Sequence, residues 1–354
     1  MSQPTTNRFH PQGAFFTELK TEVDQHLARC APPRVALALK TLFILTWWIA
    51  SWVVLVFVVD AWWQAGLVAI SLGLAMAGIG FNVQHDGGHH AASSRRGLNR
   101  LAAFGLDLLG GSSWIWHWKH NVFHHTHPNL VGLDVDIDIQ PFVRLAPQQR
   151  LRTWHRYQHL YTWFLYALLA IKWHFVDDFR DWATGHIGNQ RFPRPRGFEL
   201  VAFILGKLAF FGWAFVVPML YHPWWKVLLG YLVASVTLSL SLAITFQAAH
   251  CVEEADFPSS ACAKGDDWAQ HQLRTSVDFG SHQSAWTSII GGLNFQTIHH
   301  LFPKLSHLEL AAIAPVVRGV CARHGIEYRV LPGFGAAIAS HFRWLRRMGA
   351  QPVA

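Results

Sequence analysis

Two long apolar regions alternate with three polar, basic regions along this chain. Between residues 41 and 84 there is no Lys, Arg or Glu, and Asp60 is the only formal charge. A second apolar region is interrupted by the turn 221–225, which contains a tryptophan pair. Because a membrane-spanning helix needs about 20 apolar residues, the pattern predicts two helical hairpins, with spans at about 36–59, 62–84, 198–220 and 225–249.

The segments outside these hairpins predict further helices that do not span. A glycine-interrupted stretch, 98–118, is expected to be re-entrant or interfacial, where protein covers its backbone. The aromatic-rich segment 142–190 has helical periodicity, but its apolar core is too short to span. A helical cap follows, ending in an amphipathic interfacial helix at 336–348. The expected fold is an all-α integral membrane protein with a polar arm at 1–34, one membrane domain at 35–345 and a tail at 346–354.

Composition favours a membrane environment and argues against nucleic acid. Only 14% of the residues are charged, whereas soluble domains have about 25%. Of the 29 Lys and Arg residues, 27 lie in 1–40, 85–197 and 251–354. The positive-inside rule therefore predicts that these regions and both termini are cytoplasmic, beside anionic lipid. A nucleic-acid partner would need a clustered basic face, which the sequence does not show.

The histidines are clustered, and two clusters begin where predicted spans end. His85 directly follows the span 62–84, and His250 directly follows 225–249. His85 with His89, and His120 with His124, have the i, i+4 spacing that puts two side chains on one helix face. Imidazole is the commonest metal ligand. We expect one site for two metal ions, formed by His85, His89, His120, His124, His125, His250, His299 and His300.

Polar residues near these histidines are candidates for orienting the rings, because a ligating histidine usually donates its second ring N–H to a nearby acceptor. The candidates are Asp86, His90, His117, Asn121, His127, Asp134, Asp136, Glu253 and Glu254. For the acidic ones, a solvated loop charge is the alternative interpretation. The more distant histidines, including His307 and His324, are expected to be ordinary hydrogen-bonded side chains.

The ligand set favours iron but leaves other metals open. Eight neutral imidazoles without a thiolate differ from the cysteine-rich sites of structural zinc. The H-E-x-x-H pattern of zinc proteases is absent from the sequence. Ligand softness alone excludes neither copper nor zinc. A redox site at the end of an apolar helix bundle suits chemistry on a lipid-like chain.

Three histidine motifs stand out with their spacing: His85-Asp-x-x-His89, His120-x-x-x-His124-His125 and Gln296-x-x-His299-His300. Together with the longer strings around them, they resemble the membrane fatty acid desaturase family, closest to its acyl-CoA and front-end branch. The resemblance covers about 35–345. It implies a non-haem di-iron centre held by the eight histidines, with Gln296 as a weak or water-mediated ligand.

The resemblance also implies a reaction and its partners. The substrate would be a fatty acyl chain linked to CoA, a carrier protein or a lipid, and a double bond would be introduced into it. Dioxygen would be the co-substrate, and electrons would come from an external ferredoxin-like or b-type cytochrome-like donor.

Other functions remain open at this point. The same centre would also permit acyl-chain hydroxylation or alkyne formation. A metal or haem transporter would need ionisable residues inside its helices, and only Lys207 qualifies. Ile298 occupies a position where family members commonly have an acidic residue. Isoleucine there is either neutral at a solvent-facing turn, or it changes how the acyl chain is placed and which product forms.

Overall fold

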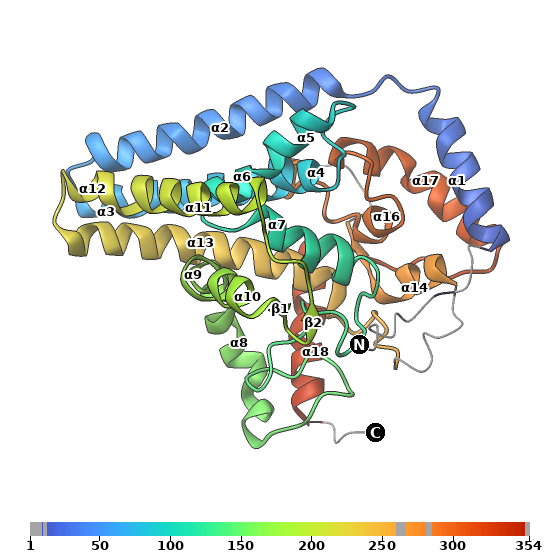
Figure 1. Cartoon of the computed structure of the whole chain (residues 1–354). Helices are drawn as coiled ribbons and strands as arrows, with labels where there is room; N and C mark the ends of the chain where they lie inside the picture. The colour runs from blue at the N-terminus through green and yellow to red at the C-terminus, as the bar shows by residue number, and fades with distance from the viewer. Residues whose placement is uncertain (1–8, 10–12, 260–266, 281–284, 351–354) are drawn as a thin grey trace.

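The computed structural model describes residues 9, 13–259, 267–280 and 285–350. Within this part of the chain, four helical segments are long and apolar enough to cross a membrane: Arg34–Phe57, Trp62–Gly88, Phe198–Met219 and Trp224–His250. They run side by side in Figure 1, with both connecting turns at the same end of the bundle. The predicted all-α membrane fold with two hairpins is confirmed.

Two of the four spans contain π-helical turns. The first and last spans are continuous α-helices, α2 (Arg34–Phe57) and α13 (Trp224–His250). The second consists of α3 (Trp62–Gly78), the π-helix η1 (Ile79–Gln84) and α4 (His85–Gly88). The third consists of α11 (Phe198–Phe211), the π-helix η5 (Gly212–Val216) and α12 (Val217–Met219). π-Helical turns are rare and occur frequently at functional sites.

Helix α3 packs between α2 and α13 in the centre of the bundle. The contact with α13 is close, because a Cβ atom at Gly73 would lie 2.4 Å from the Ala234 carbonyl oxygen. Small residues at such contacts let membrane helices approach closely. The outer faces of the bundle expose apolar side chains such as Leu42, Phe43 and Leu67, which suits contact with lipid.

The chain between the hairpins forms short elements and no single spanning helix, as expected. The stretch 98–118 falls in α5 (Arg96–Ala103), α6 (Gly105–Leu108), α7 (Ser113–Trp116) and the start of the π-helix η2 (His117–His124). Next come the 3-10 helix η3 (Thr153–Tyr157), α8 (Gln158–Ala167), α9 (Leu169–Lys172), the π-helix η4 (Trp173–Asp177) and α10 (Asp178–Thr184). An antiparallel pair follows, β1 (His186–Ile187) with β2 (Gln190–Arg191).

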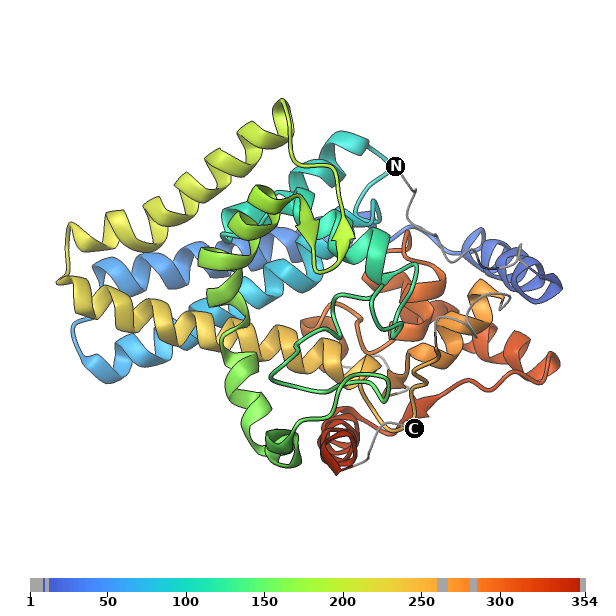
Figure 2. The same ribbon diagram turned by 60° about the horizontal axis from the view of Figure 1, so that its bottom comes forward.

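The C-terminal region forms a helical cap over the end of the bundle away from the turns (Figure 1). It comprises α14 (Trp268–Thr275), α15 (Ala285–Ile289), α16 (Gln296–Leu301), α17 (His307–Arg323) and α18 (Phe334–Ala350), and β3 (Asp278–Phe279) pairs in parallel with β4 (Val330–Leu331). Helix α1 (Ala14–Leu27), in the expected polar arm, buries Phe15, Leu19 and Val23 against the cap. Figure 2 shows α1 beside α17.

Helix α18 differs from the interfacial helix expected with a bare apolar face. Its Ala337, Trp344 and Leu345 are buried, and it packs against η3, α8 and α13. The amphipathic pattern therefore serves packing within the protein. The helix also continues to Ala350, past the boundary expected at 345, and residues 351–354 of the expected tail lie outside the described residues.

Candidate metal centre

The structure brings together all eight histidines predicted as ligands. His85 and His89 come from α4 and its end, His120 and His124 from η2, His125 directly follows η2, His250 ends α13, and His299 and His300 lie on α16. All eight side chains are buried. They meet at the end of the bundle that the cap covers, so segments far apart in the sequence contribute to one cluster.

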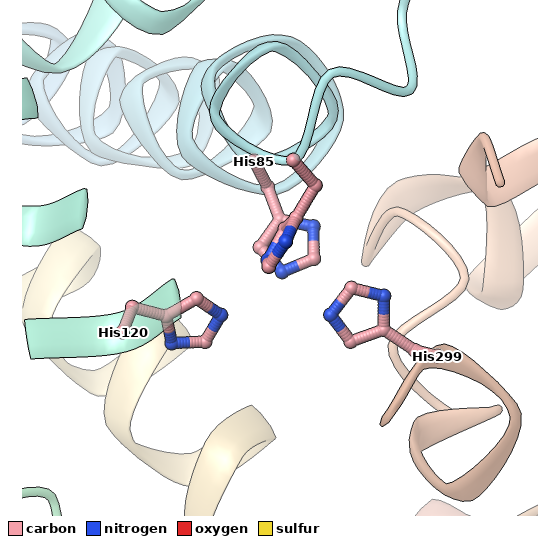
Figure 3. A group of neighbouring side chains, drawn as sticks. His85, His120 and His299 are labelled. Atoms are coloured by element: carbon pink, nitrogen blue, oxygen red, sulfur yellow. The ribbon is translucent and has the colours of Figure 1, made fainter. Parts of the chain in front are cut away.

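The eight rings form two groups joined by one ring. Ligand nitrogens of His85, His89, His120 and His299, the first histidine group, lie within 4.8 Å of one another. Figure 3 shows the labelled rings of three of these residues facing a common space. Those of His124, His250 and His300, the second histidine group, lie equally close together.

His125 connects the two groups. Its Nε2 lies 3.1 Å from Nε2 of His120 and 3.1 Å from Nε2 of His299, both in the first group. Its ring also stacks on that of His300 in the second group, with 4.3 Å between centroids. Two metal ions held by this cluster would therefore be neighbours.

Each ring of the second group is held by a polar partner at Nδ1. For His124 the partner is the Asp134 carboxylate, 3.1 Å away. For His250 it is the Thr275 carbonyl oxygen at 3.1 Å, and for His300 the Gln272 Oε1 atom at 2.9 Å. When Nδ1–H donates to such an acceptor, Nε2 is left free to bind a metal.

The buried nitrogens of the cluster fit a bound cation. Nε2 atoms of His85, His89 and His300 are buried and have no hydrogen-bond partner among the described residues. A buried polar atom without a partner is costly, and coordination of a metal ion would satisfy it. The donor set contains imidazoles only, which is the chemistry expected of a metal site rather than of a structural hydrogen-bond network.

The electrostatic environment keeps most of these rings in the neutral form that binds metals. Burial lowers the pKa of His89, His120, His125, His299 and His300 well below the usual value. His124 is an exception, because the charge and hydrogen bond of Asp134 outweigh burial and raise its pKa. Burial raises the pKa of Asp134 in turn, but the opposing contact with His124 lowers it overall.

The residues predicted to orient the rings lie in three kinds of place. Asp134 contacts His124 directly, and the Asp136 carboxylate lies 3.7 Å from His124 Nδ1 and 4.0 Å from His120 Nδ1. Asn121 donates to the Gly88 carbonyl oxygen, 2.8 Å away, and lies 3.2 Å from Nδ1 of His117. These contacts support α4 and η2 from outside the cluster.

The remaining candidates lie away from the rings of the cluster. Asp86 contacts His307, His90 is exposed, and the His127 ring stacks on Phe9. Glu253 pairs with Arg343, and Glu254 accepts a hydrogen bond from Ser340. The two glutamates therefore hold α18 in place and orient no ligand.

Several contacts of the cluster were not expected from the sequence. Gln272 and the Thr275 carbonyl come from α14, and the Trp116 ring stacks on His120 with 4.5 Å between centroids. Nε2 of Gln296 lies 3.1 Å from His250 Nε2. Ile298 is fully buried in the apolar core of the cap, so the interpretation of a solvent-facing turn is wrong.

Two adjoining cavities lie beside the first histidine group. A polar cavity of about 590 Å³ includes Lys119, Asp138, Lys172, Arg180 and Asp181 in its lining. A much smaller apolar cavity of about 30 Å³ is lined by His85 together with Met76, Gly80, Leu238 and Leu242. Both cavities border Leu106, Gly111, Trp116 and Trp173, so a polar entrance leads to an apolar space at the metal centre.

Comparison with known proteins agrees with this arrangement of histidines. The model of the family described as fatty acid desaturase matches residues 60–332. This chain belongs to the fatty acid desaturase family. It is therefore an oxidoreductase that introduces double bonds into fatty acyl chains.

Similar proteins are front-end desaturases, as the motifs indicated. The sn-1 linoleoyl-lipid 6-desaturase of Arthrospira platensis is 33% identical over 96% of this chain and 93% of its own length. The enzyme of the same name from Synechocystis sp. is 33% identical over 97% of each chain. An acyl-lipid (8-3)-desaturase of Physcomitrium patens is 36% identical over 88% of this chain and 66% of its own length.

Proposed function

We propose that this desaturase uses a non-haem di-iron centre and dioxygen to desaturate a lipid-linked acyl chain. The observation that carries the proposal is the cluster of eight buried imidazoles, some with unpaired nitrogens, beside an apolar cavity. A bound iron pair would supply the oxidising power to remove hydrogen from an unactivated methylene. The protein's own task is to hold the ligands, exclude water and place the chain.

The geometry supports a division of ligands between the ions. The first histidine group would hold one ion, and the second group would hold the other. His125 lies between them and is available to either. Gln296, beside His250, would act at most as a weak or water-mediated ligand.

The smaller cavity supports a path for the acyl chain past the first histidine group. Its lining runs from His85 to Met76 on one span and from Phe246 to Leu238 on α13. At a helical rise of 1.5 Å per residue, this lining extends about 12 Å into the bundle. Its volume of about 30 Å³ is close to that of one water molecule, so a chain must displace flexible side chains such as Met76 to enter.

The larger cavity supports a lipid head group without net negative charge. Each cation in its lining already has a carboxylate partner: Lys119 with Asp136, Lys172 with Asp177, and Arg180 with Asp177 and Asp181. A polyanionic group such as CoA would find no free cation there. The relatives whose names specify acyl lipids agree with a lipid-linked substrate.

The electron donor would be a separate ferredoxin-like or b-type cytochrome-like protein on the cytoplasmic face. We place both termini and the metal centre on that face, because most Lys and Arg residues lie in the same regions of the sequence. Exposed Arg150, Arg156, Arg346 and Arg347 around η3 and α18 would attract an acidic carrier. Anionic lipid competes for the same residues.

Metal and product analysis test the proposal together. We expect about two irons per chain and a singly desaturated product when a reductase system and a lipid-linked acyl substrate are supplied. Mass spectrometry would separate desaturation from hydroxylation or alkyne formation. Tightly bound zinc with no iron-dependent activity would contradict the proposal. A transporter would bind iron loosely, and Lys207, which could have served a transport path, pairs with Asp178 at 2.8 Å.

A further inference from the structure

We infer that His307 is a positioning residue that fixes the short helix carrying His85 and His89. The inference rests on the proposed metal centre, because these two histidines matter as ligands. His307 begins α17, far along the chain from α4, and the sequence gave it no role beyond an ordinary hydrogen bond. Its partner is Asp86, which lies between the two histidines on α4.

The contact between His307 and Asp86 is buried and double. Asp86 is 3% exposed and His307 is 5% exposed. Nδ1 of His307 lies 2.7 Å from Oδ2 of Asp86, and the backbone nitrogen of His307 lies 3.3 Å from the same oxygen. A buried carboxylate requires such partners, since it has lost its water.

The other side of the imidazole contacts a cation on the first span. Nε2 of His307 lies 2.8 Å from Nζ of Lys40, and Lys40 also donates to the Ser288 carbonyl oxygen, 2.6 Å away. Because a lysine ammonium can only donate, Nε2 must be the acceptor and Nδ1 must carry the hydrogen. One neutral tautomer thus links Lys40 on α2 to Asp86 on α4.

Helix α4 needs an outside anchor for its orientation. It has four residues, too few to be stable alone, and it follows a π-helical turn. Among the described residues, the rings of His85 and His89 donate to no carboxylate or backbone acceptor. Asp86 is therefore the polar side chain through which α2 and α17 hold this helix. A Cβ atom at Gly292 would lie 2.8 Å from the His307 carbonyl oxygen, so glycine there leaves room for the contact.

Three substitutions of His307 separate positioning from packing. His307→Ala removes both contacts, His307→Asn can still donate to Asp86 from the Nδ1 position, and His307→Gln reaches only toward Lys40. His155→Ala is the matched control. His155 is also a fully buried histidine with two hydrogen bonds, to the Pro141 carbonyl oxygen and the Arg152 backbone nitrogen, but it lies on η3 away from the cluster.

Chelator competition with ferrous iron on the purified full-length protein measures the effect. We expect about 10–100-fold weaker binding in His307→Ala and His307→Gln, the loss typical of groups that orient ligands. His307→Asn and His155→Ala should bind iron as the wild type does. The idea fails if His307→Ala keeps wild-type affinity while its thermal stability drops like that of His155→Ala. If the alanine variant does not fold, equal affinity of the Asn and Gln variants overturns it.

Hydrogen–deuterium exchange over residues 85–90 of the metal-free protein gives a second readout. Exchange there should be faster in His307→Ala and His307→Gln than in the wild type, His307→Asn or His155→Ala. Unchanged exchange would overturn the positioning role. If the wild-type protein binds no iron at all, the proposed metal centre is wrong, and the exchange data alone decide whether His307 fixes α4.

Discussion

The two histidine groups differ in how firmly the protein holds their rings. In the second group, each ring has a polar partner at Nδ1: Asp134, the Thr275 carbonyl or Gln272. In the first group, the rings of His85, His89 and His299 have no such acceptor among the described residues, and His85 borders the apolar cavity. A ring held by a hydrogen bond is oriented before the metal arrives, whereas a ring held by packing can adjust. We therefore expect the second group to be the rigid half and the first group to be the half that substrate approaches.

Removing a ligand gives the largest expected effect and tests whether both groups are needed. His299→Ala, His124→Ala and His300→Ala should each abolish desaturation, because each removes a nitrogen from a metal ion. The protein should still insert, since the apolar spans carry the membrane fold. His324→Ala, on the partly exposed end of α17, should be nearly silent. Product analysis in membranes measures this, and activity surviving in His299→Ala alone would make the first group dispensable.

Ile298→Glu should damage both groups at once, because α16 supplies His299 to the first and His300 to the second. Ile298 is fully buried among apolar side chains of the cap. An uncompensated charge there should destabilise the cap by about 3 kcal/mol or more. Thermal unfolding and metal content should fall together, whereas Ile298→Val should cost about 1 kcal/mol. A stable Ile298→Glu protein with full iron and altered products would restore the alternative in which this position controls chain placement.

Asp134→Asn should weaken the second group selectively. The carboxylate contacts His124 Nδ1 and also accepts the backbone N–H groups of Asn129 and Asp136. We expect a loss of about 10–100-fold in metal affinity or activity. Asp136→Asn is the control, since that carboxylate is partly exposed and lies farther from the rings. Titration with ferrous iron distinguishes them, and equal losses would contradict the special role of Asp134.

Gly80→Val should act on the cavity at the first group while leaving the metal in place. A Cβ atom at Gly80 would lie 3.5 Å from a Leu242 methyl group, an ordinary contact, but the larger side chain would fill the small cavity. We expect kcat/KM for long acyl chains to fall about tenfold relative to shorter ones, with iron content unchanged. Gly66→Val, on α3 in open space, should leave this preference unaltered. The same shift in both variants would exclude the cavity as the chain path.

The sequence predicted those features that depend on local properties. Apolar length defined the four spans, and i, i+4 spacing singled out His85 with His89 and His120 with His124. Contacts between distant segments could not be predicted in this way. Gln272 and Thr275 reach the rings through the fold of the cap, and nothing in their spacing marks them.

The errors have the same origin. Glu253 and Glu254 lie near His250 in the sequence, yet α13 ends there and the chain turns toward α18. Ile298 is next to a ligand, yet successive residues on a helix point in different directions, and its side chain enters the cap core. His307 was passed over because no motif links it to Asp86.

The π-helix η1 makes the alignment of the centre a matter of chain length. A π-turn contains one residue more than an α-turn, and each α-helical residue rotates the chain by about 100°. Deleting one residue within Ile79–Gln84 would let the helix wind uniformly and would turn His85 and His89 together by about that angle. All the histidine motifs would remain intact, and the helix would still cross the membrane. A gene with every motif present but one codon fewer here would therefore encode a protein that looks complete and has lost its centre.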